Sequence, residues 1–305
     1  MTASPILALL DAVAIPWTAS RAELMDRHGV RRDPWYDDDI VLLETPQPLV
    51  PGLMRPIGFR PVPRFAPWLP PVYLSGYVHQ SGDPHRNLDM TAAALSTWLG
   101  PGRPSGVSNT RGWRWQEGLS IIELTCWPPE LQPPGLQNRA HEREPRLAVA
   151  CHLTICTGYR PPVTPEEQAG LDGFEEIGRL AETGLRIAGN DAPEYALEFI
   201  RDPGADAGRF AGRVGLSRGH LIFGWDELYV VAVERILRFE LLHLTPARGP
   251  GGAFLYVHCA TAIPAWPEKR LVMAGGLDLD RTEALAAKLA RTTGKPVERS
   301  TAPDD

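Results

Sequence analysis

The fold of this chain is decided by residues 212–262, GRVGLSRGHLIFGWDELYVVAVERILRFELLHLTPARGPGGAFLYVHCATA, because no other segment alternates apolar and polar side chains so persistently. Apolar residues recur at every second position in successive runs, which is typical of strands with one buried face. Glycine, proline and polar residues interrupt these runs at 224–227, 245–252 and 263–269, where they favour turns. We therefore predict an antiparallel meander.

A helix is expected to follow this meander and to close it. Leu285 and Leu289, with alanines around them, form an apolar stripe at helical spacing. Asp280 or Thr282 can cap the start of the helix, and Gly294 is expected to end it. The C-terminal part of the chain is thus predicted to be a curled antiparallel sheet with a closing helix.

The start of the meander also carries a short motif. Gly212-Arg213-Val214-Gly215-Leu216-Ser217 runs into Leu221-Ile222-Phe223, which is similar to the opening G-x-x-x-L-[ST]-x-x-x-L-x-F of GRAM and related domains. With the closing helix, about a third of the chain resembles the pleckstrin-homology-like superfold. The resemblance implies a binding platform and brings no catalytic residues with it. The basic loop by which some relatives hold phosphoinositides is poorly matched, because the first turn supplies only Arg218 and His220.

The length of the chain predicts two domains. A chain of 305 residues can bury two cores, and its 31 prolines cluster in runs that we expect to be extended connectors. We predict an α+β protein with an N-terminal domain at 1–160, built of helices and antiparallel strands, and a C-terminal domain at 161–300. Residues 301–305 are expected to be a disordered tail.

The N-terminal domain shows one order of elements twice. A capped helix ending near Gly29 is followed by an aromatic turn and a strand at 40–44. A helix at 88–99 is followed by an aromatic segment at 113–118 and a strand at 119–124. This order is loosely similar to the paired helix-then-sheet units of BamE-like proteins and β-lactamase inhibitor proteins. An internal duplication and a chance similarity are both compatible with it.

A linking helix is predicted between the domains. Thr164-Pro165-Glu166-Glu167 combines an N-cap, a first-turn proline and a glutamate at the third position. An apolar face continues from Leu171 to Ala188, so we expect the helix to extend to Gly189. Glycines within it would weaken an isolated helix, so tertiary packing has to stabilise it.

Two groups of residues invite a catalytic interpretation. Gly215-Leu216-Ser217-Arg218-Gly219 matches the G-x-S-x-G nucleophile elbow, but the residues after it are typical of a strand where the elbow needs a helix. His79, Asp83, His85 and Asp89 are residue types that bind zinc or iron, but the residues between them are not typical of a helix that presents an i, i+4 pair of ligands, and Asp83-Pro84 is typical of a turn. We prefer a turn for the first group and a polar loop for the second, and we assign no catalytic or metal residues.

The candidate partner-binding residues are acidic and aromatic. Asp37, Asp38 and Asp39 form a block of like charge beside Trp35 and Tyr36, and an equivalent position in the second unit holds Trp113 and Trp115. Carboxylates can steer a basic partner and aromatic rings can anchor it. A solvated turn is the plainer interpretation of 35–39, and core packing is the plainer one for at least one of Trp113 and Trp115.

The charge, hydropathy and cysteine positions of the chain argue against nucleic-acid binding, a membrane span and a disulfide between Cys151 and Cys156. A formal net charge of −6 with scattered arginines argues against nucleic-acid binding and is compatible with a basic protein partner. No apolar run approaches a membrane span, so we expect a cytoplasmic protein. The four cysteines lie in strand-like apolar stretches, and Cys151 and Cys156 are expected on opposite faces of one strand, which argues against a disulfide between them.

Together these features predict a non-catalytic bacterial protein that binds a basic protein partner, of the immunity or inhibitor kind. We expect no cofactor, since no P-loop, dinucleotide fingerprint or H-E-x-x-H motif occurs. Two alternatives are a hydrolase of an unrecognised family, either an esterase or a metal-dependent enzyme, and peripheral lipid binding through the C-terminal domain.

Overall fold

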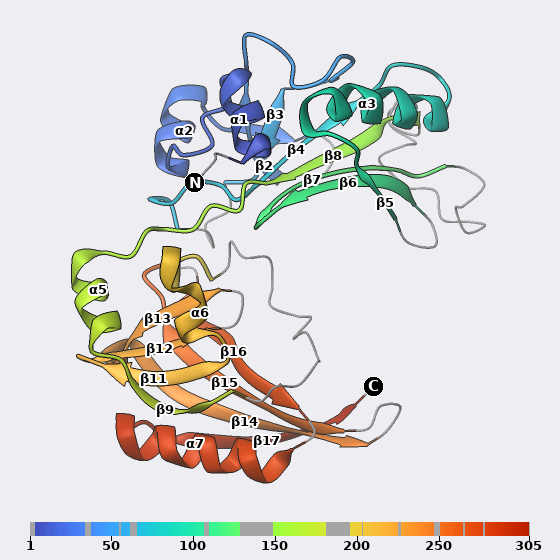
Figure 1. Ribbon diagram of the computed structural model, residues 1–305. Helices are drawn as coiled ribbons and strands as arrows, with labels where there is room; N and C mark the ends of the chain where they lie inside the picture. The colour runs from blue at the N-terminus through green and yellow to red at the C-terminus, as the bar shows by residue number, and fades with distance from the viewer. Residues whose placement is uncertain are drawn as a thin grey trace. The chain divides into compact units, whose positions relative to one another are not determined.

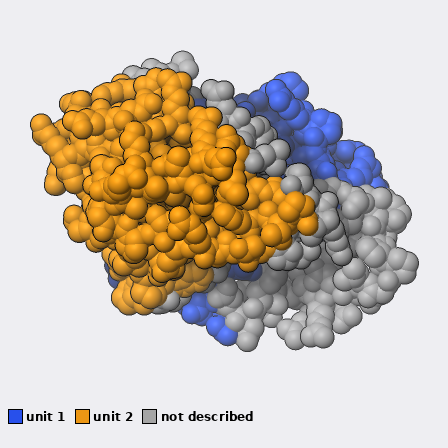
Figure 2. Space-filling view, turned by 90° about the horizontal axis from the view of Figure 1, so that it is seen from below, with its two compact units in different colours: residues 1–159 blue, residues 160–305 orange. Residues whose placement is uncertain are grey.

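The computed structural model describes residues 4–33, 38–54, 56–61, 66–106, 110–128, 149–180, 196–202, 204–224, 227–246, 251–264, 266–276 and 278–304. These residues form two compact units, Met1–Tyr159 (unit 1) and Arg160–Asp305 (unit 2), which Figure 2 colours separately. Both units combine helices with antiparallel or mixed sheets, so the α+β class is confirmed.

Unit 1 is an eight-stranded antiparallel sheet with helices packed on one face (Figure 1). Its elements in chain order are α1 (Pro5–Ala12), α2 (Arg21–His28), β1 (Arg31–Asp33), β2 (Asp38–Leu43), β3 (Ile57–Phe59), β4 (Tyr73–Val78), α3 (Pro84–Leu99), β5 (Arg103–Ser105), β6 (Arg111–Glu117), β7 (Ser120–Cys126) and β8 (Cys151–Cys156).

The helices of unit 1 begin where the sequence supplies caps. Ser20 and Glu23 form a reciprocal capping box at α2, and the Asp83 side chain accepts the His85 N–H at the start of α3. Apolar residues of α1 and α3 then pack on the sheet face that carries the buried side chains of β4, β7 and β8. Strand alternation thus leaves the opposite sheet face to partly buried polar and aromatic residues.

The strand order of unit 1 is β1-β2-β3-β4-β8-β7-β6-β5, so two four-stranded meanders meet at the antiparallel β4–β8 pair. Helices precede each meander, as the repeated order of elements predicts. In this symmetric order β2 corresponds to β6. The predicted repeat instead pairs the strand at 40–44, which lies in β2, with the strand at 119–124, which lies mostly in β7. The aromatic segment at 113–118 lies mostly in β6 itself. A duplication stays a hypothesis.

Unit 2 contains a five-stranded and a four-stranded sheet around one core, closed by a helix (Figure 1). Its elements are α5 (Pro165–Asp172), β9 (Glu175–Arg179), β10 (Ile200–Arg201), α6 (Ala207–Phe210), β11 (Arg213–Ser217), β12 (His220–Gly224), β13 (Leu228–Ala232), β14 (Ile236–Pro246), β15 (Gly252–Ala260), β16 (Glu268–Gly276), α7 (Leu279–Thr293) and β17 (Val297–Asp304).

The predicted meander and closing helix are both present in unit 2. Strands β11, β12 and β13 pair in sequence, and after a short 3-10 turn β14, β15 and β16 do the same. Helix α7 buries Leu285, Ala286 and Leu289 against both sheets and ends at Gly294, which has a left-handed φ of 71°. Its N-cap is Asp278, whose side chain accepts the Arg281 N–H at 2.9 Å, two residues before the expected Asp280.

The long linking helix predicted from Thr164 to Gly189 is wrong. Thr164 and Glu167 do form the expected capping box, but α5 ends at Asp172 and the chain continues as β9. Phe174 packs edge-on against Phe210, and β9 pairs with β11. Glycines disfavour a helix in this segment, and it forms a strand that pairs with β11. Residues 181–189 lie outside the described residues.

The disordered tail predicted at 301–305 is also wrong for all but the last residue. Residues 301–304 belong to β17, which pairs in parallel with β14 from Phe239↔Val297 to Pro246↔Asp304. The β14 edge supplies backbone hydrogen-bonding groups that a solvated tail would leave unpaired. Asp305 lies outside the described residues.

Candidate functional site

The described part of the acidic segment, Asp38 and Asp39, lies near the outer edge of the unit 1 sheet. Trp35, Tyr36 and Asp37 fall outside the described residues, while Asp38 and Asp39 begin β2 and pair with β1, the terminal strand. Asp39 lies 3.6 Å from Arg32, and Glu44 lies 3.6 Å from Arg31. The four side chains are 59–68 % exposed, so these ion pairs are weak, on the order of 0–1 kcal/mol.

The two arginines do not cancel the negative charge of this edge. Residues 31–44 contain five acidic residues and two arginines, which leaves a formal charge of −3. We call these fourteen positions the acidic edge. It combines the exposed carboxylates of Asp39 and Glu44 with β1, the terminal strand of this sheet among the described residues.

Trp113 and Trp115 lie in β6 with their side chains toward the core of unit 1. Trp113 is partly buried and packs against this core. Trp115 is only 4 % exposed, and its indole N–H donates to the Gly100 carbonyl at 3.0 Å. Because a partner could reach Trp115 only after the core opened, we do not keep it as a partner contact.

Ser217 lies at the end of β11, in a hairpin and not in a nucleophile elbow. Its cross-strand partner is His220, the first residue of β12, and the turn between them places Arg218 and Gly219 at φ values of 40° and 80°. After this two-residue turn the backbone is extended from His220 onward as β12, where a nucleophile elbow would begin a helix. The Ser217 hydroxyl is buried and has no hydrogen-bond partner among the described residues.

The glycines of the G-x-S-x-G match have structural roles. A Cβ at Gly215 would overlap the Glu175 carbonyl oxygen and come within 2.6 Å of the Phe174 ring, so Gly215 permits close pairing with β9. Gly219 supplies the positive φ that the two-residue turn requires. The motif thus reflects the geometry of a hairpin.

The histidines and aspartates at 79–89 do not gather around one point. Asp83 caps α3, and the Nδ1 of His85 accepts a hydrogen bond from the Arg111 guanidinium at 2.7 Å. A guanidinium at this distance repels a cation. Within the described ranges, no three His, Cys, Asp or Glu side chains are arranged to hold a metal ion.

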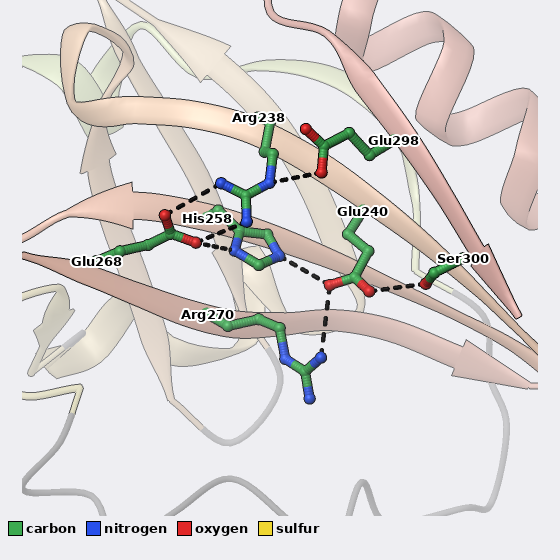
Figure 3. A network of polar contacts seen from close by, with 7 residues as sticks. All are labelled: Arg238, Glu240, His258, Glu268, Arg270, Glu298 and Ser300. Atoms are coloured by element: carbon green, nitrogen blue, oxygen red, sulfur yellow. Dashed lines mark hydrogen bonds and ion pairs between the residues drawn. The ribbon is translucent and has the colours of Figure 1, made fainter. Parts of the chain in front are cut away.

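A polar cluster that the sequence analysis did not predict spans four strands of unit 2 (Figure 3). His258 of β15 lies between two carboxylates: its Nε2 is 2.8 Å from Glu240 of β14, and its Nδ1 is 2.5 Å from Glu268 of β16. Ser300 of β17 donates to the second Glu240 oxygen at 2.8 Å. Arg238 contacts Glu268 through two hydrogen bonds and forms an ion pair with Glu298 at 2.9 Å.

His258 lies in contact with a carboxylate at each of its two ring nitrogens. The same two carboxylates also face arginines, because Arg238 pairs with Glu268 and Arg270 lies 3.5 Å from Glu240. The contacts thus connect side chains of β14, β15 and β16, and Glu298 and Ser300 extend them to β17.

The surrounding charges hold both central carboxyls ionised. Burial opposes ionisation of Glu240, but hydrogen bonds from His258 and Ser300 and the charge of Arg270 outweigh it and lower its pKa. Hydrogen bonding from Arg238, followed by the effects of His258, lowers the pKa of Glu268. The only hydroxyl in the cluster donates to a carboxylate and not to the imidazole, so the arrangement lacks a nucleophile–base contact. The cluster therefore acts as a clamp that binds β17 to the sheet.

Sequence patterns alone carried only a faint signal for this clamp. Polar residues recur at every second position in three strands, as Arg238 and Glu240, Glu268 and Arg270, and Glu298 and Ser300. Which of these pairs meet depends on strand register, which those residues do not reveal. His258 has a hydrogen-bonding contact at each ring nitrogen, as is usual for a structural histidine in a strand.

The sequence matches no protein-family model and no curated protein. No helix in the part of the chain that the structure describes combines the length and the apolar character needed to cross a bilayer.

Proposed function

We propose that this chain is a non-catalytic binding protein that recognises a basic protein partner through the acidic edge of unit 1. The observation that carries the proposal is a net negative, solvent-exposed sheet edge, formed by β1 and β2 with Asp39 and Glu44 at its surface. Exposed carboxylates at an interface rim raise the association rate with a positively charged partner and disfavour acidic ones.

The sequence beside these carboxylates supports the same proposal. Trp35 and Tyr36 adjoin the three aspartates, and aromatic residues are the side chains that most often dominate interface energies. Strand β1 is short and carries charged side chains, which discourages pairing with an unselected strand. A partner with complementary charge is attracted by the same side chains that disfavour other strands, so the charge of this edge selects the partner. We propose a cytoplasmic role of the immunity or inhibitor kind, in which binding masks the partner.

The proposal is tested by comparing protein recovery with three forms of the full chain. The first is wild type, the second carries Asp37→Asn, Asp38→Asn and Asp39→Asn, and the third carries Asp26→Asn, Asp89→Asn and Asp280→Asn. The control aspartates are exposed and lie elsewhere, so both variants remove the same charge. Lysate from the source cells is passed over each immobilised protein, and recovered proteins are quantified by mass spectrometry.

The expected result is a basic protein recovered by wild type and by the control variant, and recovered at least tenfold less by the acidic-edge variant. Recovery should also fall steeply between 0.05 and 0.5 M salt, because exposed charges are screened over about 10 Å at 0.1 M ionic strength. Failure to recover any protein whose yield depends on Asp37, Asp38 and Asp39 contradicts the proposal. Hydrolysis of an ester or phosphoester by purified protein would support the hydrolase alternative in its place.

A second candidate function, peripheral lipid binding by unit 2, is favoured by one end of the four-stranded sheet. Leu237 is 41 % exposed and Trp266 is 40 % exposed. Leu237 lies at the start of β14 and Trp266 lies just before β16, and the strand register places these two strand starts at the same end of the sheet. Tryptophan and apolar side chains at a loop tip partition into a bilayer interface. Flotation with liposomes tests this function, and Trp266→Ala should abolish flotation while Trp98→Ala should leave it unchanged.

A further inference from the structure

Two buried thiols of unit 1 face each other across neighbouring strands. Cys126 is the last residue of β7 and Cys151 is the first residue of β8. The registered pair Thr125↔His152 precedes them, so the next opposed positions are Cys126 and Cys151. Both side chains are fully buried and belong to the same hydrophobic core.

The backbone geometry of such a pair matches that of a disulfide. Directly opposed residues of antiparallel strands have Cα atoms about 4.5–5.5 Å apart, and disulfides join Cα atoms about 4.4–6.8 Å apart. The two thiols already interact, since a hydrogen bond with the Cys126 thiol, with burial, raises the pKa of the Cys151 thiol. Neither cysteine is joined in a disulfide in this structure.

We propose that Cys126 and Cys151 form a dithiol redox site, which a small-molecule disulfide oxidises to a cross-strand disulfide. The two cysteines immediately flank residues 127–150 in the sequence, so a disulfide between them would form a covalent loop that contains this segment. Cys156, at the far end of β8, lies opposite Ile121 and Tyr73. Cys259, in unit 2, lies opposite Ile236 and Lys269.

The reaction balances as two exchange steps. The thiolate of one cysteine attacks a sulfur of the small-molecule disulfide, forming a mixed disulfide and releasing one small thiolate, which takes up the proton lost by the cysteine. The second cysteine then attacks the protein sulfur of the mixed disulfide, and the second small thiol leaves with the second proton. The protein loses two protons and two electrons, and one small-molecule disulfide becomes two thiols.

Burial sets the rate and selectivity of this chemistry. A buried thiol whose pKa is raised reacts slowly, because the thiolate is the nucleophile. Both cysteines lie at strand ends, where local opening costs less than global unfolding. The reaction is therefore gated by fraying of the β7–β8 end, and mild urea should accelerate it before unit 1 unfolds.

The test uses the full chain, oxidised with excess oxidised glutathione and then denatured and alkylated. Intact mass should show two alkylated cysteines instead of four, and peptide mapping should join Cys126 to Cys151. The oxidised protein should unfold at a midpoint roughly 5–10 °C higher, as expected for a closed loop of this length, and dithiothreitol should reverse both changes. The variants Cys156→Ala and Cys259→Ala should retain the reaction, and Cys126→Ala and Cys151→Ala should lose it.

Four alkylated cysteines after oxidation in mild urea overturn the proposal, as does a bridge that involves Cys156 or Cys259. Persistent glutathione adducts at Cys126 or Cys151 overturn it as well, because they show that the second thiol cannot reach the first. The wild-type mapping decides the question even where a cysteine variant fails to fold.

Discussion

Replacing Ser217 by alanine is predicted to stabilise unit 2, or to leave its stability unchanged, whereas replacing Ser120 is predicted to destabilise unit 1. The two serines are equally buried, at 6 % exposure each. The Ser217 hydroxyl has no hydrogen-bond partner among the described residues, while the Ser120 hydroxyl donates to the Thr157 carbonyl at 2.8 Å. The pair therefore separates the effect of an unpaired buried hydroxyl from that of a paired one.

The magnitudes follow from these contacts. An unpaired buried polar group costs about 1–3 kcal/mol, and removing one oxygen gives up only a few packing contacts of about 0.1–0.2 kcal/mol each. Ser217→Ala should then change the free energy of unfolding by about 0 to +2 kcal/mol. Ser120→Ala loses a hydrogen bond and leaves a buried carbonyl unpaired, so its free energy of unfolding should fall by about 1–2 kcal/mol.

Gly173 provides an internal check on the position of the Ser217 hydroxyl. A Cβ at Gly173 would lie 2.9 Å from the Ser217 oxygen, and the φ of −90° at Gly173 is one that alanine adopts freely. Gly173→Ala should be destabilising alone and should become less so in the Ser217→Ala background. A coupling of about 1 kcal/mol is expected, because the two sites are in contact.

Urea unfolding followed by far-ultraviolet circular dichroism measures all these variants, with each unit's transition fitted separately. A loss of more than about 1 kcal/mol in Ser217→Ala would refute the reasoning, because it requires a hydrogen bond at Ser217 that the structure does not contain. Additive effects of Gly173→Ala and Ser217→Ala would refute the placement of the hydroxyl against α5.

Three further predictions concern the clamp, the β9–β11 pair and His152. The pKa values of Glu240 and Glu268 are lowered in the folded protein. Their contribution to the stability of unit 2 is therefore complete above the usual pKa of 4.5 and is lost as pH falls through the lower folded values. Unfolding curves at successive pH values should show this loss, and Glu240→Gln should make the free energy of unfolding depend less steeply on pH. Gly215→Ala should destabilise unit 2 by several kcal/mol, because its Cβ would overlap the Glu175 backbone, whereas Gly208→Ala, with no atom within 4 Å, should change the urea midpoint little. Burial, with the charge of Arg60, lowers the pKa of His152 to about 4, so the unfolded chain binds a proton at this imidazole near pH 6.5 and the folded chain does not. The stability of unit 1 should therefore fall by roughly 2 kcal/mol or less between pH 6.5 and 4. An NMR titration that shows protonation of His152 above pH 6 would contradict this prediction.

The sequence was informative where local signals agree with long-range packing. Capping residues located the starts of α2 and α5, Gly294 located the end of α7, and alternation located the strands of the 212–262 segment. These features depend on a few neighbouring residues, so a single sequence reveals them.

The sequence failed where a partner strand distant in the chain decides the outcome. The segment after Gly173 has apolar spacing compatible with a helix, but pairing with β11 makes it a strand. Residues 301–304 have little apolar character, and only the β14 edge makes them part of a sheet. Register also brings together the clamp residues and the Cys126–Cys151 pair, although spacing within any one strand indicates neither.

The most direct measurement of the central claim is site-specific photocrosslinking in the source cells. Tyr36 is replaced by p-benzoyl-phenylalanine within the acidic edge, and in a control chain Trp98, an exposed residue of α3, is replaced by the same group. We predict that irradiation links a basic protein to position 36, that the adduct disappears when Asp37, Asp38 and Asp39 are changed to asparagine, and that position 98 gives no such adduct. An adduct with the same protein at position 98 and none at position 36, or an adduct at 36 that survives loss of the three carboxylates, would contradict the account.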